Sequence, residues 1–175
     1  LEIVEYLKLI NTKIDNLLIS VGGGGLISGV SSYVKQFYPK IKIIGVEPEN
    51  ANGLNQSLRA NKPLNNVNVN SIADSLSAPL HMQYSFDVAK EVIDEMVTVS
   101  DEQMKKFMVF CYKKFKLFLE PACVAGLAAL KYKINNKLIG KNTMVILCGS
   151  NIDKKTWSDL TLSLIHISEP TRLSL

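Results

Sequence analysis

Four consecutive glycines, Gly22 to Gly25, are the residues of this chain whose type and spacing most clearly suggest chemistry. They follow an apolar run over residues 17–21 and precede an amphipathic stretch that opens at Leu26, so the pattern predicts a strand-to-helix turn without side chains. Glycine takes backbone angles that other residues avoid and lets a ligand approach the main chain. Because a helix N-terminus also offers unpaired N–H groups and the positive end of a dipole, we expect this turn to bind a phosphate.

Two further segments place polar residues where a predicted strand ends. Glu47 opens the segment EPEN, and Cys148 opens the segment CGSN. Ligands bind outside the carboxyl ends of parallel strands, so both segments should share one edge of the sheet with the glycines. A solvated loop carboxylate is an equally good interpretation of Glu47, and a small buried residue that ends a strand is the alternative for Cys148.

Two kinds of cofactor that carry phosphate could use such an edge. A dinucleotide needs the spacing GxGxxG and an acidic residue about 20 positions later. Glu47 meets the second condition, but Ile27 or Ser28 stands where the third glycine belongs. An unbroken run of glycines suits a compact phosphate monoester surrounded by successive N–H groups. Pyridoxal phosphate therefore fits the turn better than a dinucleotide.

The elements that position these residues alternate between strands and helices. Short apolar, β-branched runs predict strands over residues 16–21, 41–46, 96–99 and 143–148, and stretches of helical periodicity separate them. This order is typical of an α/β protein with a mostly parallel, twisted sheet and helices on both faces. Residues 60–70, with Pro63 and five asparagines, indicate a surface loop.

Local signals set the bounds of several helices. The segment SDEQ from Ser100 to Gln103 is a capping box that opens a helix running to about Leu119. Ser85 can cap a helix over residues 86–95, and Pro121 lets a further helix begin over residues 122–134. Apolar residues at helical spacing predict the buried face of this long helix: Met104, Phe107, Met108, Cys111 and Phe115. Cys123, in the next helix, is also predicted to be a core residue.

The composition excludes several classes of protein. The chain has 175 residues, of which 47% are hydrophobic and 21% are charged, and it contains no apolar run near the ~20 residues of a membrane span. The net charge of +4 is mild and the basic residues are scattered, which argues against nucleic acid as a partner. Three cysteines without CxxC spacing argue against a disulfide framework and a zinc site, and they fit a reducing cytoplasm.

The two ends do not match the pattern of a complete protein. The chain begins inside a helical pattern with no capping residue, so we expect a missing N-terminal portion. Residues 162–175 include the segment LSLIHISEPTR, which resembles the translation of a transposase adapter used in sequencing libraries. We therefore expect these residues to be non-native and disordered, which removes His166 from the catalytic candidates.

Five motifs, in this order and spacing, resemble the second half of the fold-type II pyridoxal-phosphate enzymes, close to the threonine/serine dehydratases and serine racemases: VGGGGLISGV, IIGVEPENANG, SIADSL, LEPACVAGLAAL and ILCGSNID. The resemblance spans residues 1–160 and identifies them as the C-terminal part of a catalytic domain. It implies that Gly22, Gly23, Gly24, Gly25 and Leu26 bind the phosphate of pyridoxal 5′-phosphate. It also implies that Cys148 faces the pyridine nitrogen and that Glu120 lies near the cofactor. A carboxylate at a helix end is the alternative for Glu120.

The same resemblance implies a β-elimination reaction, the dehydration and deamination of L-threonine and/or L-serine to a 2-oxo acid and ammonia. An amino-acid racemase or a β-replacement synthase of the same fold is an alternative, as is a dinucleotide-binding domain of an oxidoreductase. A non-catalytic remnant is a third alternative. In this family the lysine that forms the Schiff base lies upstream of the position of Leu1. The fragment alone is therefore expected to be inactive.

The resemblance extends to a cation and to partners. In metal-dependent relatives a carboxylate, a main-chain oxygen and a second acid hold the ion, at the positions of Glu47, Ala51 and Gly53. Gly53 replaces the second acid, so the resemblance no longer implies a divalent site. It implies at most a more weakly bound or monovalent ion at Glu47 and Ala51. Ser75 stands where racemases commonly have glycine, which favours a dehydratase. A small amino-acid substrate and a homo-oligomer are also implied.

Overall fold

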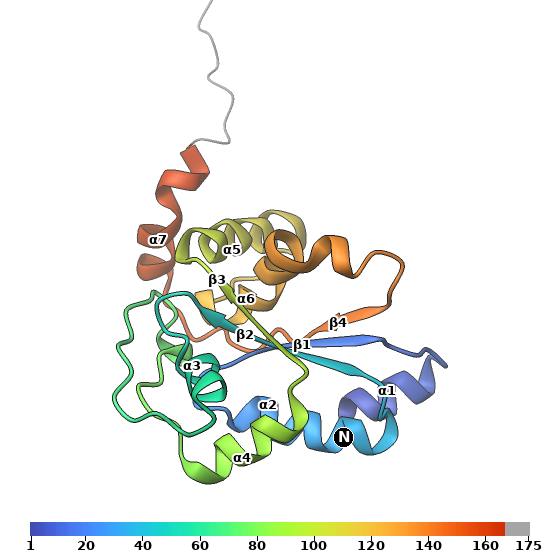
Figure 1. Ribbon diagram of the computed structural model, residues 1–175. Helices are drawn as coiled ribbons and strands as arrows, with labels where there is room; N and C mark the ends of the chain where they lie inside the picture. Colours follow the sequence, from blue (N-terminus) through green and yellow to red (C-terminus); the bar gives the residue numbers. More distant parts are fainter. Residues whose placement is uncertain (167–175) are drawn as a thin grey trace, which may run out of the picture.

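In the computed structural model, which describes residues 1–166, four strands form one sheet in the order β3-β2-β1-β4 (Figure 1). The strands are β1 (Asn16–Ser20), β2 (Lys42–Pro48), β3 (Glu95–Val99) and β4 (Thr143–Val145). All pairings are parallel, and Leu18 of β1 aligns with Ile44 on one side and with Val145 on the other. The parallel sheet confirms the expected α/β class, and it places the carboxyl ends of the strands at one edge.

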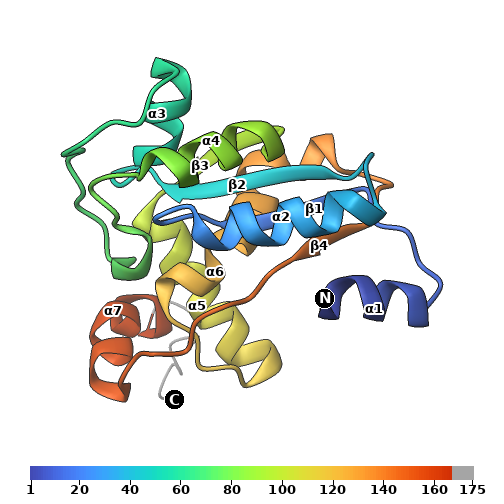
Figure 2. The ribbon, with the colours of Figure 1, turned by 90° about the horizontal axis from the view of Figure 1, so that it is seen from below.

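Helices cover both faces of the sheet, as the sequence predicts. α1 (Glu2–Leu9), α2 (Gly25–Phe37) and α4 (Gln83–Val92) lie on one face, whereas α5 (Asp101–Phe115) and α6 (Pro121–Ala129) lie on the other (Figure 1). α3 (Gly53–Ala60) follows β2, and α7 (Lys154–His166) lies beside α5 (Figure 2). The remaining elements are short helical turns at Asp74–Leu76, Leu130–Ile134 and Asn135–Lys137.

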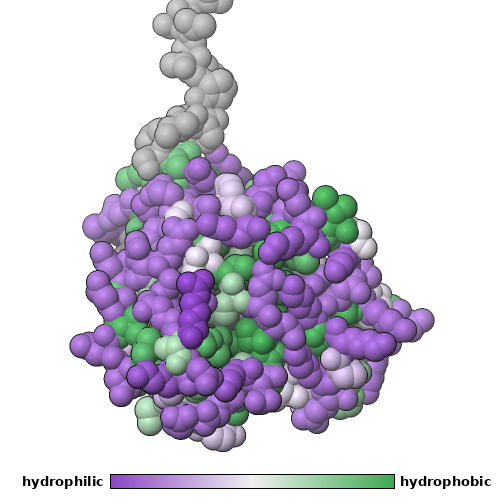
Figure 3. Space-filling view, viewed as in Figure 1, coloured by the Kyte–Doolittle hydropathy of each residue, from purple (hydrophilic) through white to green (hydrophobic). Residues whose placement is uncertain are grey.

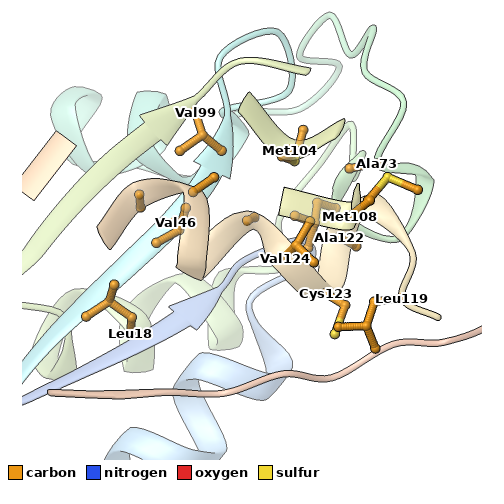
Figure 4. Close-up of a cluster of buried hydrophobic side chains, with 14 of the residues drawn as sticks. Leu18, Val46, Ala73, Val99, Met104, Met108, Leu119, Ala122, Cys123 and Val124 are labelled. Atoms are coloured by element: carbon orange, nitrogen blue, oxygen red, sulfur yellow. The ribbon is translucent and has the colours of Figure 1, made fainter. Parts of the chain in front are cut away.

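The core has two halves because the strands are buried on both faces, as is usual for parallel sheets. Leu18 and Ile44 pack with residues of α5 and α6 in the cluster drawn in Figure 4. Their neighbours Leu17 and Ile43 pack with residues of α2 and α4 on the opposite face. This alternation follows from the pleat, which turns successive side chains to opposite faces.

α6 packs closely on the sheet because its residues are small. Ala125, Ala128 and Ala129 are fully buried, and a Cβ on Gly126 would lie 2.6 Å from Cγ1 of Val145 in β4. The alanine-rich sequence thus lets the helix backbone approach β1 and β4. Its first turn follows Glu120 directly, so this packing fixes Glu120 with respect to the sheet.

The predicted capping box forms at the start of α5. The main-chain nitrogen of Gln103 donates to Oγ of Ser100 at 3.3 Å, and the main-chain nitrogen of Ser100 donates to Oε1 of Gln103 at 3.1 Å. Two N–H groups that the helix cannot satisfy therefore find partners within four residues.

Several helix ends differ from those expected. α4 begins at Gln83, so Ser85 lies inside its first turn and is not its cap; the side chain of Gln83 supports the earlier start by donating to Asp87 at 2.8 Å. α5 ends at Phe115 because Lys116 takes a left-handed φ of 59°. Phe115 is therefore 58% exposed and contacts the ring of Phe110, whereas a buried position was expected. α6 ends at Ala129, where a wider helical turn takes over.

The C-terminal segment is partly described. α7 includes residues 162–166, for which we expected no ordered structure. The helix is anchored by Trp157, whose ring stacks on Phe118, and Thr161 one turn later is also buried. Residues 167–175 lie outside the described residues, and the adapter origin of the tail stays a prediction.

Figure 3 shows one face of the surface of the described residues. Hydrophilic residues cover most of the face seen in Figure 3, and hydrophobic residues show between them. None of the helices within residues 1–166 combines the length and the apolar character that crossing a membrane requires.

Candidate cofactor site

The glycine turn joins β1 to α2, as predicted. Gly24 is the N-cap of α2 and has a φ of +87°, a left-handed conformation that glycine adopts without strain. No side chain caps this helix, so its first N–H groups, those of Gly25 and Leu26, have no partner within the helix. Together with the positive end of the helix dipole, these groups favour an anion in front of the turn.

The four glycines have different surroundings. A Cβ on Gly22 would lie 2.5 Å from the carbonyl oxygen of Ser75, so this position has room only for a hydrogen atom. A Cβ on Gly23 or Gly25 would meet no atom within 4 Å. Gly22 therefore holds the turn against the rest of the protein, while Gly23 and Gly25 border open space.

A cavity of about 320 Å³ opens beside the turn, at the carboxyl edge of β1 and β4. Its volume lies within the range of small-molecule sites. Ser75 and Gly149 line it, and so does every residue predicted to bind the cofactor: Gly22, Gly23, Gly24, Gly25, Leu26, Glu120 and Cys148. The fold thus brings together residues from distant parts of the sequence into one site.

Glu120 is held in the cavity wall by Ser75. Oγ of Ser75 donates to Oε1 of Glu120 at 3.1 Å, and Glu120 is only 9% exposed. Glu120 is the N-cap of α6, but its side chain makes no capping hydrogen bond. A Cβ on Gly149 would collide with this carboxylate, so the glycine makes room for it. The side chain therefore serves the cavity and not the helix end.

The three cysteines, all of them free, divide into buried and exposed thiols. Cys111 and Cys123 lie in the core, as predicted. Burial, followed by the nearby charge of Glu120, raises the pKa of Cys123 to about 12. Cys148 is exposed at the cavity because β4 ends at Val145, earlier than expected. The alternative of a buried residue at a strand end is therefore wrong for Cys148.

Glu47 lies away from this cavity. It is 1% exposed, and its two oxygens accept hydrogen bonds from the main-chain nitrogens of Leu54 at 2.8 Å and Asn55 at 2.9 Å, in the first turn of α3. Burial raises the pKa of Glu47 to about 7, while the two N–H donors act in the opposite direction. Because the side chain does not reach solvent, it is neither a solvated loop carboxylate nor a ligand for a ribose.

The residues expected to hold a cation do not form a recognisable metal centre. Ala51 is 1% exposed, and Gly53 supplies no acid. Within the part of the chain that the structure describes, no group of three or more His, Cys, Asp or Glu side chains is placed to hold a metal ion. A weaker ion at Glu47 and Ala51 stays a prediction.

Two contacts of the site escape sequence reasoning. Ser75 stands out in the sequence only as a departure from glycine, and its bond to Glu120 joins residues 45 positions apart. Nε2 of His81 lies 2.9 Å from the carbonyl oxygen of Gly22, across 59 positions. An isolated histidine between Leu80 and Met82 carries no motif, so no local signal could have identified it.

A second cavity of about 320 Å³ adjoins the first, since Ser75 and Glu120 line both. Its other walls carry polar side chains that include Asp74, Asn151 and Thr156. Two adjacent spaces at this edge leave room for a second small molecule beside a ligand of the glycine turn.

A protein family and a curated relative match most of this chain. The family model described as pyridoxal-phosphate dependent enzyme matches residues 1–149. A phenylserine dehydratase of Ralstonia pickettii is 39% identical over 145 residues, which are 83% of this chain and 44% of that protein.

Two solved structures are similar over most of this chain. Threonine deaminase isoform 2 from Solanum lycopersicum has a TM-score of 0.83 and 32% identity, covering 91% of this chain and 46% of its own. Maize serine racemase has a TM-score of 0.79 and 30% identity, covering 95% of this chain and 51% of its own. The chain spans about half the length of the proteins that it matches.

Proposed function

Because this chain belongs to the family of pyridoxal-phosphate dependent enzymes, we propose that its protein dehydrates and deaminates L-threonine and/or L-serine to a 2-oxo acid and ammonia. The observation that carries the proposal is the single cavity in which the glycine turn, Glu120 and Cys148 meet. Family membership also removes the alternative of a dinucleotide-binding domain, which the buried position of Glu47 had already disfavoured.

The glycine turn fits the phosphate of this cofactor. We name the main-chain N–H groups of Gly23 to Leu26 the glycine cradle, and we assign them to the phosphate oxygens. The absence of side chains supports this assignment, since a Cβ on Gly23 or Gly25 would enter the open space that an anion needs. Such N–H groups bind an anion without a lysine or arginine.

Cys148 is the residue that we assign to the pyridine nitrogen. When bound, pyridoxal phosphate draws electrons from the Cα–H bond of an amino acid, and the surrounding protein selects the outcome. A carboxylate at the pyridine nitrogen would strengthen this electron withdrawal by keeping the nitrogen protonated. A neutral thiol does not do so, and the electron withdrawal is then weaker. Milder withdrawal favours prompt loss of the β-hydroxyl over return of a proton to Cα.

Glu120 and Ser75 form the polar wall beside this position. The hydrogen bond from Ser75 fixes one carboxylate oxygen, and burial limits the movement of the side chain. A fixed acceptor in a largely buried wall can orient a polar group of a substrate in the space next to the cofactor. The adjoining cavity, which the same two residues line, supports this assignment.

The names of the relatives favour elimination over racemization. One relative is named a phenylserine dehydratase and one a threonine deaminase, whereas the maize protein is named a serine racemase. The full-length protein should therefore release 2-oxobutanoate from L-threonine or pyruvate from L-serine. It should also show the absorption band of bound pyridoxal 5′-phosphate, and borohydride should remove that band. Formation of D-serine without pyruvate would instead identify a racemase, and a colourless protein indifferent to added pyridoxal 5′-phosphate would refute the proposal.

The proposal includes a homo-oligomer in a reducing cytoplasm. Large apolar side chains exposed near the end of α5, at Phe110, Phe115 and Leu117, support an interface there. Three free thiols support the reducing compartment. Light scattering on the full-length protein tests the homo-oligomer, and the mass of a monomer would contradict it. Cell fractionation tests the cytoplasmic location.

A further inference from the structure

His81 is a buried histidine that contacts the glycine turn from behind. It is 2% exposed, and its Nε2 lies 2.9 Å from the carbonyl oxygen of Gly22. A carbonyl oxygen only accepts hydrogen bonds, so Nε2 carries the proton and donates it. Nδ1, on the other side of the ring, is buried and has no hydrogen-bond partner within the described residues.

This hydrogen bond fixes the direction of the next N–H group. In a trans peptide unit the carbonyl of one residue and the N–H of the following residue point in opposite directions. With the carbonyl of Gly22 held toward His81, the N–H of Gly23 must point away from the imidazole. Gly23 borders the cavity, so a bond behind the turn sets the orientation of a donor in front of it.

The ring is confined by glycines on two sides. A Cβ on Gly53, the first residue of α3, would lie 3.0 Å from Cε1 of His81, and a Cβ on Gly24 would lie 3.9 Å from Cδ2. The imidazole therefore fills the space between the glycine turn and the start of α3. A larger residue at position 53 would push the ring toward the turn.

We propose that His81 is a positioning residue that orients the glycine cradle for the phosphate of the cofactor. The inference rests on the proposed function, because it assumes that the cradle binds this phosphate. His81 touches neither the reacting atoms nor the phosphate. It acts through the peptide unit between Gly22 and Gly23.

The test uses two variants of the full-length protein, one whose side chain at position 81 can donate a hydrogen bond and one whose side chain cannot. The amide nitrogen of Gln extends about as far from the main chain as Nε2 of histidine and can donate, whereas Met has a similar length and no N–H. The measurement is the dissociation constant of the apoprotein for pyridoxal 5′-phosphate and for pyridoxal, which lacks the phosphate. Thermal unfolding of each apoprotein shows whether the variant folds.

His81→Met should weaken the binding of pyridoxal 5′-phosphate about tenfold, as expected if the N–H of Gly23 no longer donates to the phosphate. The same variant should change the binding of pyridoxal less than about twofold. His81→Gln should retain the wild-type preference for the phosphorylated ligand. The phosphorus-31 chemical shift of the bound phosphate should move in His81→Met and not in His81→Gln.

Two results would overturn the inference in different ways. If the wild-type protein binds both ligands equally, the cradle itself is refuted and the role of His81 falls with it. If the wild type prefers pyridoxal 5′-phosphate and His81→Met keeps that preference, or loses affinity for both ligands alike, only the role of His81 is refuted. Gly53→Ala adds a check, since it should weaken phosphate binding in the wild type and have little further effect in His81→Met.

Discussion

Replacing Gly22 with alanine tests whether the glycine turn must rest directly on the main chain of Ser75. The new methyl group would lie 2.5 Å from the carbonyl oxygen of Ser75 and 3.2 Å from Cα of Leu76. Comfortable contacts between non-bonded heavy atoms are about 3.5–4.0 Å, so one of the two backbones must move by roughly 1 Å. Overpacking of this kind costs roughly 1–3 kcal/mol of unfolding free energy.

The same movement displaces the N–H groups that we assign to the phosphate. Each hydrogen bond to a charged group contributes about 1.5–3 kcal/mol, so loss of one predicts at least about a tenfold weaker binding of pyridoxal 5′-phosphate. Urea denaturation of the apoprotein and titration with the cofactor measure the two effects separately. The matched control is Gly29→Ala, because a Cβ there would meet no atom within 4 Å and the residue lies within α2.

Gly29→Ala should stabilise the protein by roughly 0.5–1 kcal/mol through helix propensity and leave cofactor affinity unchanged. If Gly22→Ala matches this control in both measurements, the close packing against Ser75 has no role in binding, and our reading of the turn is refuted.

Three further changes test other parts of the structure. Cys148→Ala should lower turnover of the holoenzyme while leaving unfolding free energy within about 0.5 kcal/mol, because Cys148 is exposed at the cavity; an unchanged rate would contradict its assignment to the pyridine nitrogen. Ser100→Ala should cost about 1 kcal/mol in urea denaturation by removing the hydroxyl that accepts from the main-chain nitrogen of Gln103, and an unchanged unfolding free energy would contradict this capping role. Burial raises the pKa of Glu47 from 4.5 to about 7, so the folded state keeps a proton that the unfolded state releases, and stability falls by up to roughly 3 kcal/mol as pH rises through this window. Glu47→Gln should abolish that component, and identical pH profiles of stability for the two proteins would refute it.

The order of strands and helices could be predicted because it depends on residues that are close together in the sequence. The capping box at Ser100 and Gln103 spans four residues, and both of its hydrogen bonds form. The glycine turn depends on the change from an apolar run to an amphipathic stretch. Parallel pairing then follows, since helices connect the strands, and it gathers Glu120, Cys148 and the glycines at one edge.

Features that depend on contacts between distant segments could not be predicted in this way. Glu47 follows the predicted strand over residues 41–46 and so resembles a ligand of the sheet edge, but β2 extends to Pro48 and includes it, and α3 turns back over it and supplies two N–H groups. Ser85 resembles a helix cap, but the helix begins earlier. The bonds of Ser75 to Glu120 and of His81 to Gly22 exist only once the fold has formed.

The donors of the glycine turn are main-chain amides, and amides do not ionise over the range in which proteins stay folded. Acid or base should therefore alter the binding of a phosphoryl group through the ligand's own second ionisation and not through a change of charge on these donors. The anchor is likewise insensitive to which side chains surround the rest of the ligand. Substitutions near Cys148 and Glu120 can then redirect the reaction during evolution while the ligand stays attached at the same point.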